Sequence, residues 1–446
     1  MTQQPNLLII HTDQQSTWTL GCYGGKVVET PHIDSLANNG LLFSNFFTNS
    51  AVCTPSRGCF MTGRYPTSNG AYSNNIPLNR DEITFAEVLR QNNYRTSYVG
   101  KWHLDGDPRP GWVHPERGMG FEDNHYMFNR GHWKKIKDFP MNSKDQPQVY
   151  PYSMIGDEES YATDWLTQKT LNFLDEKDQR PFCHMLSLPD PHGPVQVRPP
   201  YDTMFQPKDI PLPETFFSSN LPDWAMKSQG EVFGHHVPNR EDKFKKWMAL
   251  YYGEVKLIDD SVGRIVEKLK TEGIYENTII VFTTDHGEYG GEHGLKDKNN
   301  LYETAYRIPM IIHWPQGLQA GLQINEVMST VDFQPTILSL MNINLCGREE
   351  GRDASPLLNN KNLEWDDFAH LHHNTHTRAG IFTKEYELAL VEHGDSVLFD
   401  RINDPHQITN LYLEPEYQSV VSNLKNRVLT HQQELGTPAL DWLSKK

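Results

Sequence analysis

The sequence lacks an excess of positive charge, long apolar runs and a disulfide pattern. Its formal net charge is −16, with 41 lysines and arginines against 57 aspartates and glutamates, which argues against nucleic acid as a general partner. No apolar run approaches the roughly 20 residues that a membrane-spanning helix needs, so we expect no membrane span. The five cysteines are scattered and odd in number, which argues against a disulfide framework. Because the chain is acidic, any site for an anion has to be a local basic pocket.

The amino terminus also lacks the basic region and cleavage site of a secretory signal. From the chain as given we expect a cytoplasmic protein, or a periplasmic or secreted one if a leader has been trimmed. The 446 residues, 37% hydrophobic and 22% charged, are enough to bury a large core. No internal repeat is evident, and nothing in the sequence indicates the oligomeric state.

What the sequence does contain is a series of short apolar runs separated by helical patterns. Four runs are typical of strands buried on both faces: residues 6–11, 94–99, 182–188 and 278–284. Amphipathic helices are expected between them. The sequence therefore predicts the α/β class, with a large mixed, mainly parallel sheet flanked by helices.

Beyond about residue 355 the pattern changes. Short runs at 377–383, 386–391 and 396–399 are typical of antiparallel strands, and 417–433 is expected to be a final helix. We therefore divide the chain into a large α/β domain, residues 1–355, and a smaller C-terminal α+β subdomain, residues 356–446, built on a short antiparallel sheet and a terminal helix.

Polar side chains of the kinds that bind ligands follow each of the four buried strands. Open α/β sheets place their sites at the carboxyl ends of strands, so these groups are expected to converge at one edge of the sheet. One such polar strand end would be weak support, whereas the coincidence of four indicates a single site. The residues concerned are Asp13, Gln14, Lys101, His103, His192, Asp285, His286 and Lys298.

Residues 53–64 form the most unusual stretch, Cys-Thr-Pro-Ser-Arg-Gly-Cys-Phe-Met-Thr-Gly-Arg. Pro55 suits the first position of a helix, because it has no N–H to leave unpaired there. Cys53 would then lie at a helix N-terminus, where backbone N–H groups favour negative charge. Arg57 adds a fixed positive charge one turn into the helix. The stretch therefore suits an anion beside a reactive group.

The Cys-x-Pro-x-Arg pattern of residues 53–57, the following Thr-Gly-Arg and the Gly-Lys-Trp-His of residues 100–103 resemble the type I, formylglycine-dependent sulfatase family of the alkaline phosphatase superfamily. The resemblance implies an alkaline-phosphatase-like fold. It also implies that a formylglycine-generating maturation enzyme oxidises Cys53 to formylglycine (3-oxoalanine), whose gem-diol is the nucleophile. The implied activity is hydrolysis of a sulfate monoester, on a sulfated small molecule or oligosaccharide.

The resemblance further implies the role of each site residue. One divalent cation, most often calcium, with magnesium or manganese as alternatives, would be held by Asp13, Gln14, Cys53, Asp285 and His286. One gem-diol hydroxyl would attack sulfur, His192 or Lys298 would protonate the leaving oxygen, and His103 would take the proton of the other hydroxyl before sulfate is released. The implied catalytic set is Cys53, Arg57, Lys101, His103, His192 and Lys298.

Candidate substrate contacts come from less specific signals. Residues 104–150 are irregular and rich in basic and aromatic side chains, which suits a sugar ring carrying anionic groups, although a solvated surface excursion fits equally well. The histidines of residues 370–376 indicate that the smaller subdomain contributes to the substrate rim. The alternative interpretation of these histidines is a second metal site. The candidates are Arg109, Arg130, Trp133 and His372.

Two other functions remain open. A phosphonate or phosphate diester hydrolase of the same superfamily shares the formylglycine motif and an Asp-Gln, Asp-His metal set, but that branch lacks the pair formed here by Lys101 and His103. The other is a sugar-binding pseudoenzyme with an unmodified Cys53. Parallel assays on sulfate and phosphonate monoesters would distinguish a sulfatase from the first alternative. The mass of the peptide around Cys53 would distinguish it from the second.

Overall fold

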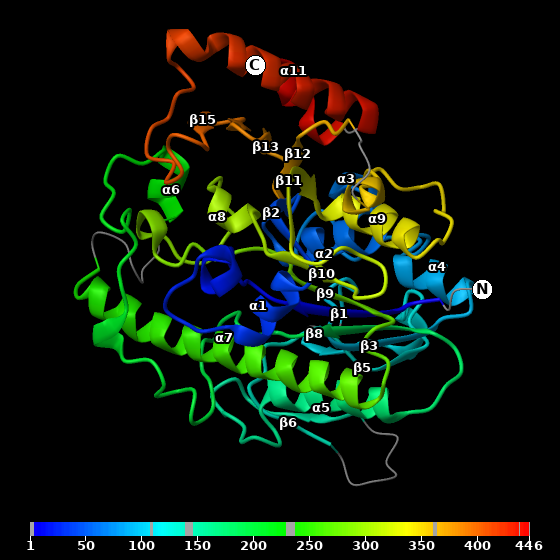
Figure 1. The fold of residues 1–446 in the computed structure, drawn as a ribbon. Coiled ribbons are helices and arrows are strands. Elements are labelled where there is room, and N and C mark those ends of the chain that lie inside the picture. The colour runs from blue at the N-terminus through cyan, green and yellow to red at the C-terminus, as the bar shows by residue number, and fades with distance from the viewer. Residues whose placement is uncertain are drawn as a thin grey trace.

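The structure, a computed structural model, describes residues 4–107, 110–138, 146–228, 237–359, 364–436 and 438–445. Its centre is a nine-stranded sheet in the order β11-β2-β10-β9-β1-β8-β3-β5-β4 (Figure 1). The strands from β9 through β1, β8 and β3 to β5 are parallel, whereas β10 is antiparallel to both of its neighbours and β4 is antiparallel to β5. The prediction of a mixed, mainly parallel sheet is confirmed. The strands are β1 (Asn6–Thr12), β2 (Leu41–Phe47), β3 (Arg95–Lys101), β4 (Gly111–Trp112), β5 (Asp123–Arg130), β8 (Phe182–Ser187), β9 (Thr278–Thr284), β10 (Met310–His313) and β11 (Leu322–Ser329).

Helices cover both faces of the sheet, and the alternation of side chains along β1 shows why. Successive side chains of a strand point to opposite faces. Leu7 and Ile9 pack with α2, α4 and α9, whereas Leu8 and Ile10 pack with α1, α5 and α7 (Figure 1). Burial on both faces accounts for the uninterrupted apolar run. The helices of the large domain are α1 (Pro31–Asn38), α2 (Cys53–Thr62), α3 (Pro66–Asn69), α4 (Phe85–Gln91), α5 (Ala162–Asp175), α6 (Asp223–Ser228), α7 (Arg240–Thr271), α8 (Glu303–Tyr306), α9 (Phe333–Leu340) and α10 (Ser355–Leu358).

Parallel pairing brings the carboxyl ends of the four predicted strands to one edge of the sheet. In β1, Ile10 pairs with Leu186 of β8 on one side and with Phe282 of β9 on the other. On the far side of β8, Gly100 of β3 pairs with Ser187. The polar segments that follow these strands are therefore neighbours in space.

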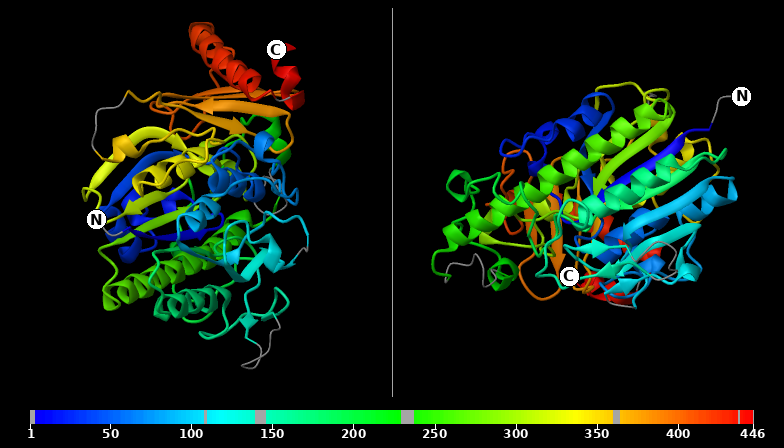
Figure 2. Two further views of the ribbon diagram at one scale, coloured as in Figure 1. Left: turned by 90° about the vertical axis from the view of Figure 1, so that its right-hand side faces the viewer. Right: turned by 90° about the horizontal axis from the view of Figure 1, so that it is seen from below.

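A four-stranded antiparallel sheet and the helix α11 (Gln418–Leu435) form a layer at one end of the molecule, drawn in orange and red in Figure 2. One face of this sheet packs on α11. The other face packs on the large domain, where the ring of Phe382 stacks on Phe47 with centroids 4.5 Å apart. The small antiparallel sheet was predicted, and the boundary at residue 355 stays a prediction. Its strands are β12 (Ala369–His372), β13 (Arg378–Phe382), β14 (Tyr386–Val391) and β15 (Val397–Asp400).

The structure corrects one part of the sequence interpretation. Within residues 104–150, which were expected to be irregular, β5 forms a full strand of the main sheet beside β3. Its side chains alternate as in β1, so that Met127 packs on one face of the sheet and Phe128 on the other. A short two-stranded ribbon, β6 (Ile136–Lys137) with β7 (Gln148–Val149), follows it. In the part of the chain that the structure describes, no helix is both long and apolar enough to cross a membrane.

Candidate active site

Cys53 is the first residue of α2, a helix that is buried at every position. Pro55 is the third helical residue and not the first as predicted, which costs no hydrogen bond because N–H groups of the first turn have no partner within the helix. Thr54, which follows Cys53, holds the start of α2 in place. Its backbone N–H donates to Asn74 Oδ1 at 3.1 Å and its hydroxyl donates to the His103 carbonyl at 2.9 Å.

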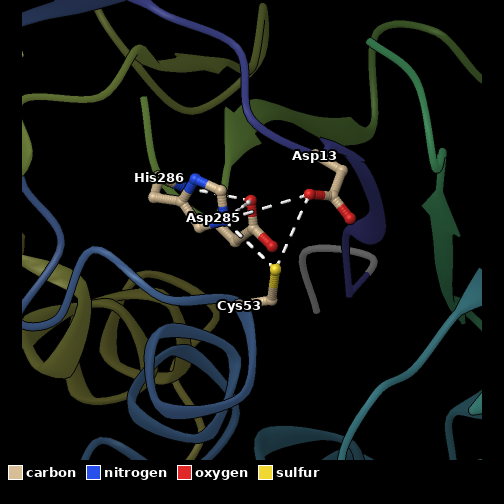
Figure 3. Close-up of side chains that lie close together, drawn as sticks. All are labelled: Asp13, Cys53, Asp285 and His286. Carbon is tan, nitrogen blue, oxygen red and sulfur yellow. Dashed lines mark hydrogen bonds and ion pairs between the residues drawn. The ribbon is translucent and has the colours of Figure 1, made fainter. Parts of the chain in front are cut away.

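Four of the predicted metal ligands converge. Asp13, Cys53, Asp285 and His286 are all buried, and one potential ligand atom from each lies within 4.8 Å of the others (Figure 3). Cys53 Sγ lies 3.2 Å from His286 Nε2 and 3.9 Å from Asp13 Oδ1. Asp13 follows β1, whereas Asp285 and His286 follow the adjacent strand β9. The convergence predicted at the sheet edge is therefore observed.

Arg57 joins the two carboxylates. Its Nε donates to Asp285 Oδ2 at 3.0 Å and its Nη2 donates to Asp13 Oδ2 at 3.4 Å. Burial and the neighbouring Asp13 act to raise the pKa of Asp285, but His286 and Arg57 outweigh them and the pKa is lowered. Burial likewise opposes ionisation of Asp13, yet Lys101 holds its pKa well below the usual range. Both carboxyl groups are therefore negatively charged.

This donor set fits a divalent cation. His286 Nδ1 lies 3.0 Å from the Gly287 carbonyl, so the Nδ1–H donates there and Nε2 keeps its lone pair for the cluster. Asp13, Asp285, His286 and an oxygen at position 53 are the groups that could hold the ion. Carboxylate oxygens suit calcium or magnesium, whereas the imidazole broadens the range of metals.

Gln14, the remaining predicted ligand, lies beside this cluster and is engaged elsewhere. Its amide nitrogen donates to Glu288, and its amide oxygen accepts from Lys298. Its backbone N–H donates to Asp285 Oδ1 at 3.1 Å. Its role as a metal ligand stays a prediction.

Two lysines and two histidines lie beside the cluster. Lys101 donates to Asp13, and its Nζ lies 3.0 Å from His132 Nε2. Lys298 Nζ lies 2.7 Å from His192 Nε2. Burial raises the pKa of the Cys53 thiol, but Lys101, Lys298 and His286 lower it further than burial raises it. Position 53 therefore lies in a region of positive potential, which suits an anionic substrate.

His132 was not among the predicted catalytic residues. The only sequence signal for it was its place in a basic and aromatic segment. Asp13, His132 and His192 also offer ligand atoms within 4.8 Å of one another. Because the ammonium groups of Lys101 and Lys298 contact these same side chains, we assign no second cation to them.

His103 lies in the site with both ring nitrogens unpaired among the described residues, although the side chain is only 3% exposed. Burial, Lys101 and Arg57 hold the pKa of this imidazole well below its usual value. The ring is therefore neutral and able to accept a proton from a group that enters the site.

The candidate substrate contacts have different outcomes. Arg130 ends β5 and is exposed, with Nη1 3.5 Å from Asn75 Oδ1. Trp133 instead lies in the core, 5% exposed and stacked on Trp112, so its ring is not available to a sugar. His372 is a buried residue of β12 with Nε2 3.0 Å from Nε2 of His431 in α11, so it also does not fit a substrate contact. Arg109 lies outside the described residues.

Other histidines of the small subdomain do reach the site region. His373 Nε2 lies 3.1 Å from the carbonyl of Asn299, which adjoins Lys298. The ring of His376 lies 4.8 Å from that of the exposed Tyr72. The contribution of the small subdomain to the substrate rim stays a prediction.

A buried two-carboxylate centre beside a polarised position 53, at the carboxyl edge of this mixed sheet, defines a hydrolase of anionic esters in the alkaline phosphatase superfamily. The sequence matches the sulfatase family model over residues 5–343, and the model of the N-sulphoglucosamine sulphohydrolase C-terminal region over residues 291–434. The chain belongs to the sulfatase family and is a sulfuric ester hydrolase.

Similar proteins include carbohydrate sulfatases. An ulvan-active sulfatase of Formosa agariphila is 30% identical over 97% of this chain and 82% of its own length. An N-acetylglucosamine-6-O-sulfatase of Bacteroides thetaiotaomicron is 27% identical over 93% of this chain and 84% of its own. A structure solved in complex with its substrate D-glucosamine-2-N,6-O-disulfate superimposes with a TM-score of 0.83 at 25% identity and covers the whole of both chains.

Proposed function

We propose that this sulfatase hydrolyses a sulfate monoester of a sulfated carbohydrate, with formylglycine made from Cys53 as its nucleophile and one divalent cation, calcium, as its metal. The observation that carries the proposal is the convergence of Asp13, Asp285 and His286 on the Cys53 side chain. The carbohydrate class is supported by the relatives, which act on ulvan or on N-acetylglucosamine sulfate by name.

The residues of the chain have separable tasks in this reaction. Arg57 holds the two carboxylates in place from inside the protein. Lys101 and Lys298 are placed to neutralise the sulfuryl oxygens, which carry the charge of the substrate. His192 and Lys298, 2.7 Å apart, form a hydrogen-bonded pair that can deliver a proton to the leaving oxygen. His103, which is neutral and has no side-chain partner among the residues that the structure describes, can take the proton that position 53 gives up.

A bound divalent ion would supply a Lewis acid that polarises a sulfuryl oxygen and orients position 53 toward sulfur. Calcium is favoured by the two carboxylates.

We infer that residues around the site also contact the sugar. Arg130 lies two residues before His132, and its neighbour Asn75 follows Asn74, which holds the start of α2. Tyr72 and His376 present a second, aromatic surface from two separate domains. An exposed guanidinium and a pair of aromatic rings suit a sugar that carries a further anionic group.

Sulfate release from sulfated mono- and oligosaccharides, measured in parallel with hydrolysis of a phosphonate monoester, tests the proposal. We expect turnover of at least one sugar sulfate and much slower turnover of the phosphonate. A strong preference for the phosphonate would contradict the proposed substrate class. Formylglycine is tested separately by the mass of the peptide that spans Cys53. The formylglycine form of this peptide is roughly 18 Da lighter than the cysteine form by atom count. An active preparation with unmodified cysteine would contradict the proposed nucleophile.

A further inference from the structure

His132 and His192 form a stacked pair inside the active site. Their ring centroids are 3.9 Å apart and their planes differ by 6°. Each ring presents Nε2 to a different lysine, His132 to Lys101 at 3.0 Å and His192 to Lys298 at 2.7 Å. An ammonium group has only protons to give, so both Nε2 atoms act as acceptors. One histidine stack therefore holds two ammonium groups.

The two lysines are also held from the opposite direction. Lys101 donates to Asp13, and Lys298 donates to Gln14, the next residue along the chain. Each ammonium is thus fixed between the end of β1 and one ring of the stack. A lysine side chain has four flexible methylene groups, so it needs such contacts to hold one position.

A buried ion pair sets the position of His132. Lys134, two residues further on and without solvent exposure, donates to Asp190 and, at 2.7 Å, to Glu254. Asp190 itself lies two residues before His192. The contact between Lys134 and Asp190 therefore joins the two segments that carry the stacked histidines.

We infer that His132 is a positioning residue of this sulfatase, which fixes the ammonium of Lys101 and supports the ring of His192. The inference rests on the proposed function, because that function assigns Lys101 to the sulfuryl oxygens and His192 to the leaving oxygen. Donors that are already aligned need no reorganisation as the reaction proceeds. Loss of His132 therefore affects two distinct steps, through two different neighbours.

Two substitutions separate these effects. His132→Phe keeps a flat ring against His192 but removes the acceptor for Lys101. His132→Gln keeps an acceptor but removes the ring. Both variants are assayed on 4-nitrophenyl sulfate, whose leaving group needs little protonation, and on a sulfated sugar that the wild-type enzyme cleaves, whose leaving alkoxide needs a proton.

The two substitutions should give different patterns. We expect His132→Phe to lower kcat about 100-fold on both substrates, because Lys101 serves the sulfuryl oxygens of either one. We expect His132→Gln to lower kcat less than 10-fold on 4-nitrophenyl sulfate and about 100-fold on the sugar sulfate, because only the second depends on proton delivery. Calorimetry gives a readout apart from turnover: inorganic sulfate should bind about 10-fold more weakly to His132→Phe and nearly normally to His132→Gln.

His184→Phe is the matched control. His184 is a buried histidine of β8 that stacks on Phe173 with centroids 4.4 Å apart, away from the site. The His184→Phe variant should keep the wild-type kcat on both substrates. The formylglycine content of every variant is checked by mass. Equal losses for His132→Phe and His132→Gln on both substrates, or no loss in either, would overturn the inference. A wild-type enzyme that cleaves no sulfate ester would contradict the proposed function instead, and sulfate binding to the variants would still test the position of Lys101.

Discussion

Arg57 donates from Nε to Asp285 Oδ2 at 3.0 Å, and neither side chain is more than 2% exposed. The pair links the second turn of α2 to the residue that follows β9, and Asp285 is itself one of the potential metal ligands. Because the guanidinium also reaches Asp13, one side chain contacts two buried carboxylates, and Lys101 supplies a second positive charge to Asp13.

Arg57→Ala is expected to lower the free energy of unfolding by about 3–5 kcal/mol, the usual cost of leaving a buried charge without its partner. Activity should fall with it, since both carboxylates lose their support. Denaturation in urea measures the first effect. Arg180→Ala is the matched control, because Arg180 pairs at the surface with Asp178 at 2.9 Å and should change stability by less than about 1 kcal/mol. Equal stability of the two variants would contradict the structural role of Arg57.

Chelation should destabilise the wild-type protein. Treatment with EDTA is expected to lower the unfolding midpoint, and calcium at 100 times its dissociation constant should restore about 2.7 kcal/mol. Asp13→Asn should remove this response, because Asp13 is a central member of the ligand cluster, whereas Asp178→Asn at the surface should keep it. A response of the same size in Asp13→Asn would place the ion elsewhere. Repeating the titration with magnesium and manganese tests the choice of calcium.

Arg130→Ala tests the rim. We expect KM for an anionic sugar sulfate to rise about 10-fold, equivalent to about 1.4 kcal/mol, with little change for 4-nitrophenyl sulfate. Arg130→Lys should recover part of the affinity. Trp133→Phe provides a contrast, because Trp133 packs in the core and its substitution should reduce stability and leave KM unchanged. A KM effect for Trp133→Phe without an effect for Arg130→Ala would reverse these assignments.

Stability should fall below neutral pH, in part through the histidines that meet between the small sheet and α11. Burial, with a smaller contribution from His370, lowers the pKa of His431 to about 2. The unfolded chain therefore takes up a proton on this residue below about pH 6.5, whereas the folded protein does not. The stabilisation is complete above that pH and decreases by about 1.4 kcal/mol per pH unit as the pH falls toward 2.

His431→Phe should remove this one contribution and flatten the pH dependence by that amount, since a phenyl ring can keep the stack on His370, whose centroid lies 3.7 Å away. Urea denaturation at pH 7, 6 and 5 measures the slope. The exposed His393 supplies the control, and His393→Gln should retain the wild-type slope. An unchanged slope in His431→Phe would mean that the folded protein protonates this ring as readily as the unfolded chain does.

The strand ends that carry the site could be predicted because β1 and β9 are buried on both faces, which leaves a continuous apolar signal in the sequence. The strand β5 left no such signal. Its sequence, Asp-Asn-His-Tyr-Met-Phe-Asn-Arg, is largely polar, and it is a strand because it pairs with β3. Residues distant along the chain therefore decide its conformation.

The same limit explains the misplaced Trp133 and the missed His132. Trp133 has polar neighbours along the chain and looks exposed, but it is buried by Trp112, which is distant in sequence. His132 meets Lys101, 31 residues away, in a segment that is also held by the ion pairs of Lys134 with Asp190 and Glu254. Neither relationship has a local sequence signal.

The burial of α2 has a consequence for the order of events in biogenesis. Every residue from Cys53 to Thr62 is enclosed by the finished fold. Under the proposed function, the enzyme that oxidises Cys53 has to reach its side chain, which is only 2% exposed in the folded protein. The proposed oxidation therefore has to take place before the sheet assembles. Protein that folds earlier would keep Cys53 as a thiol and would be stable but inactive.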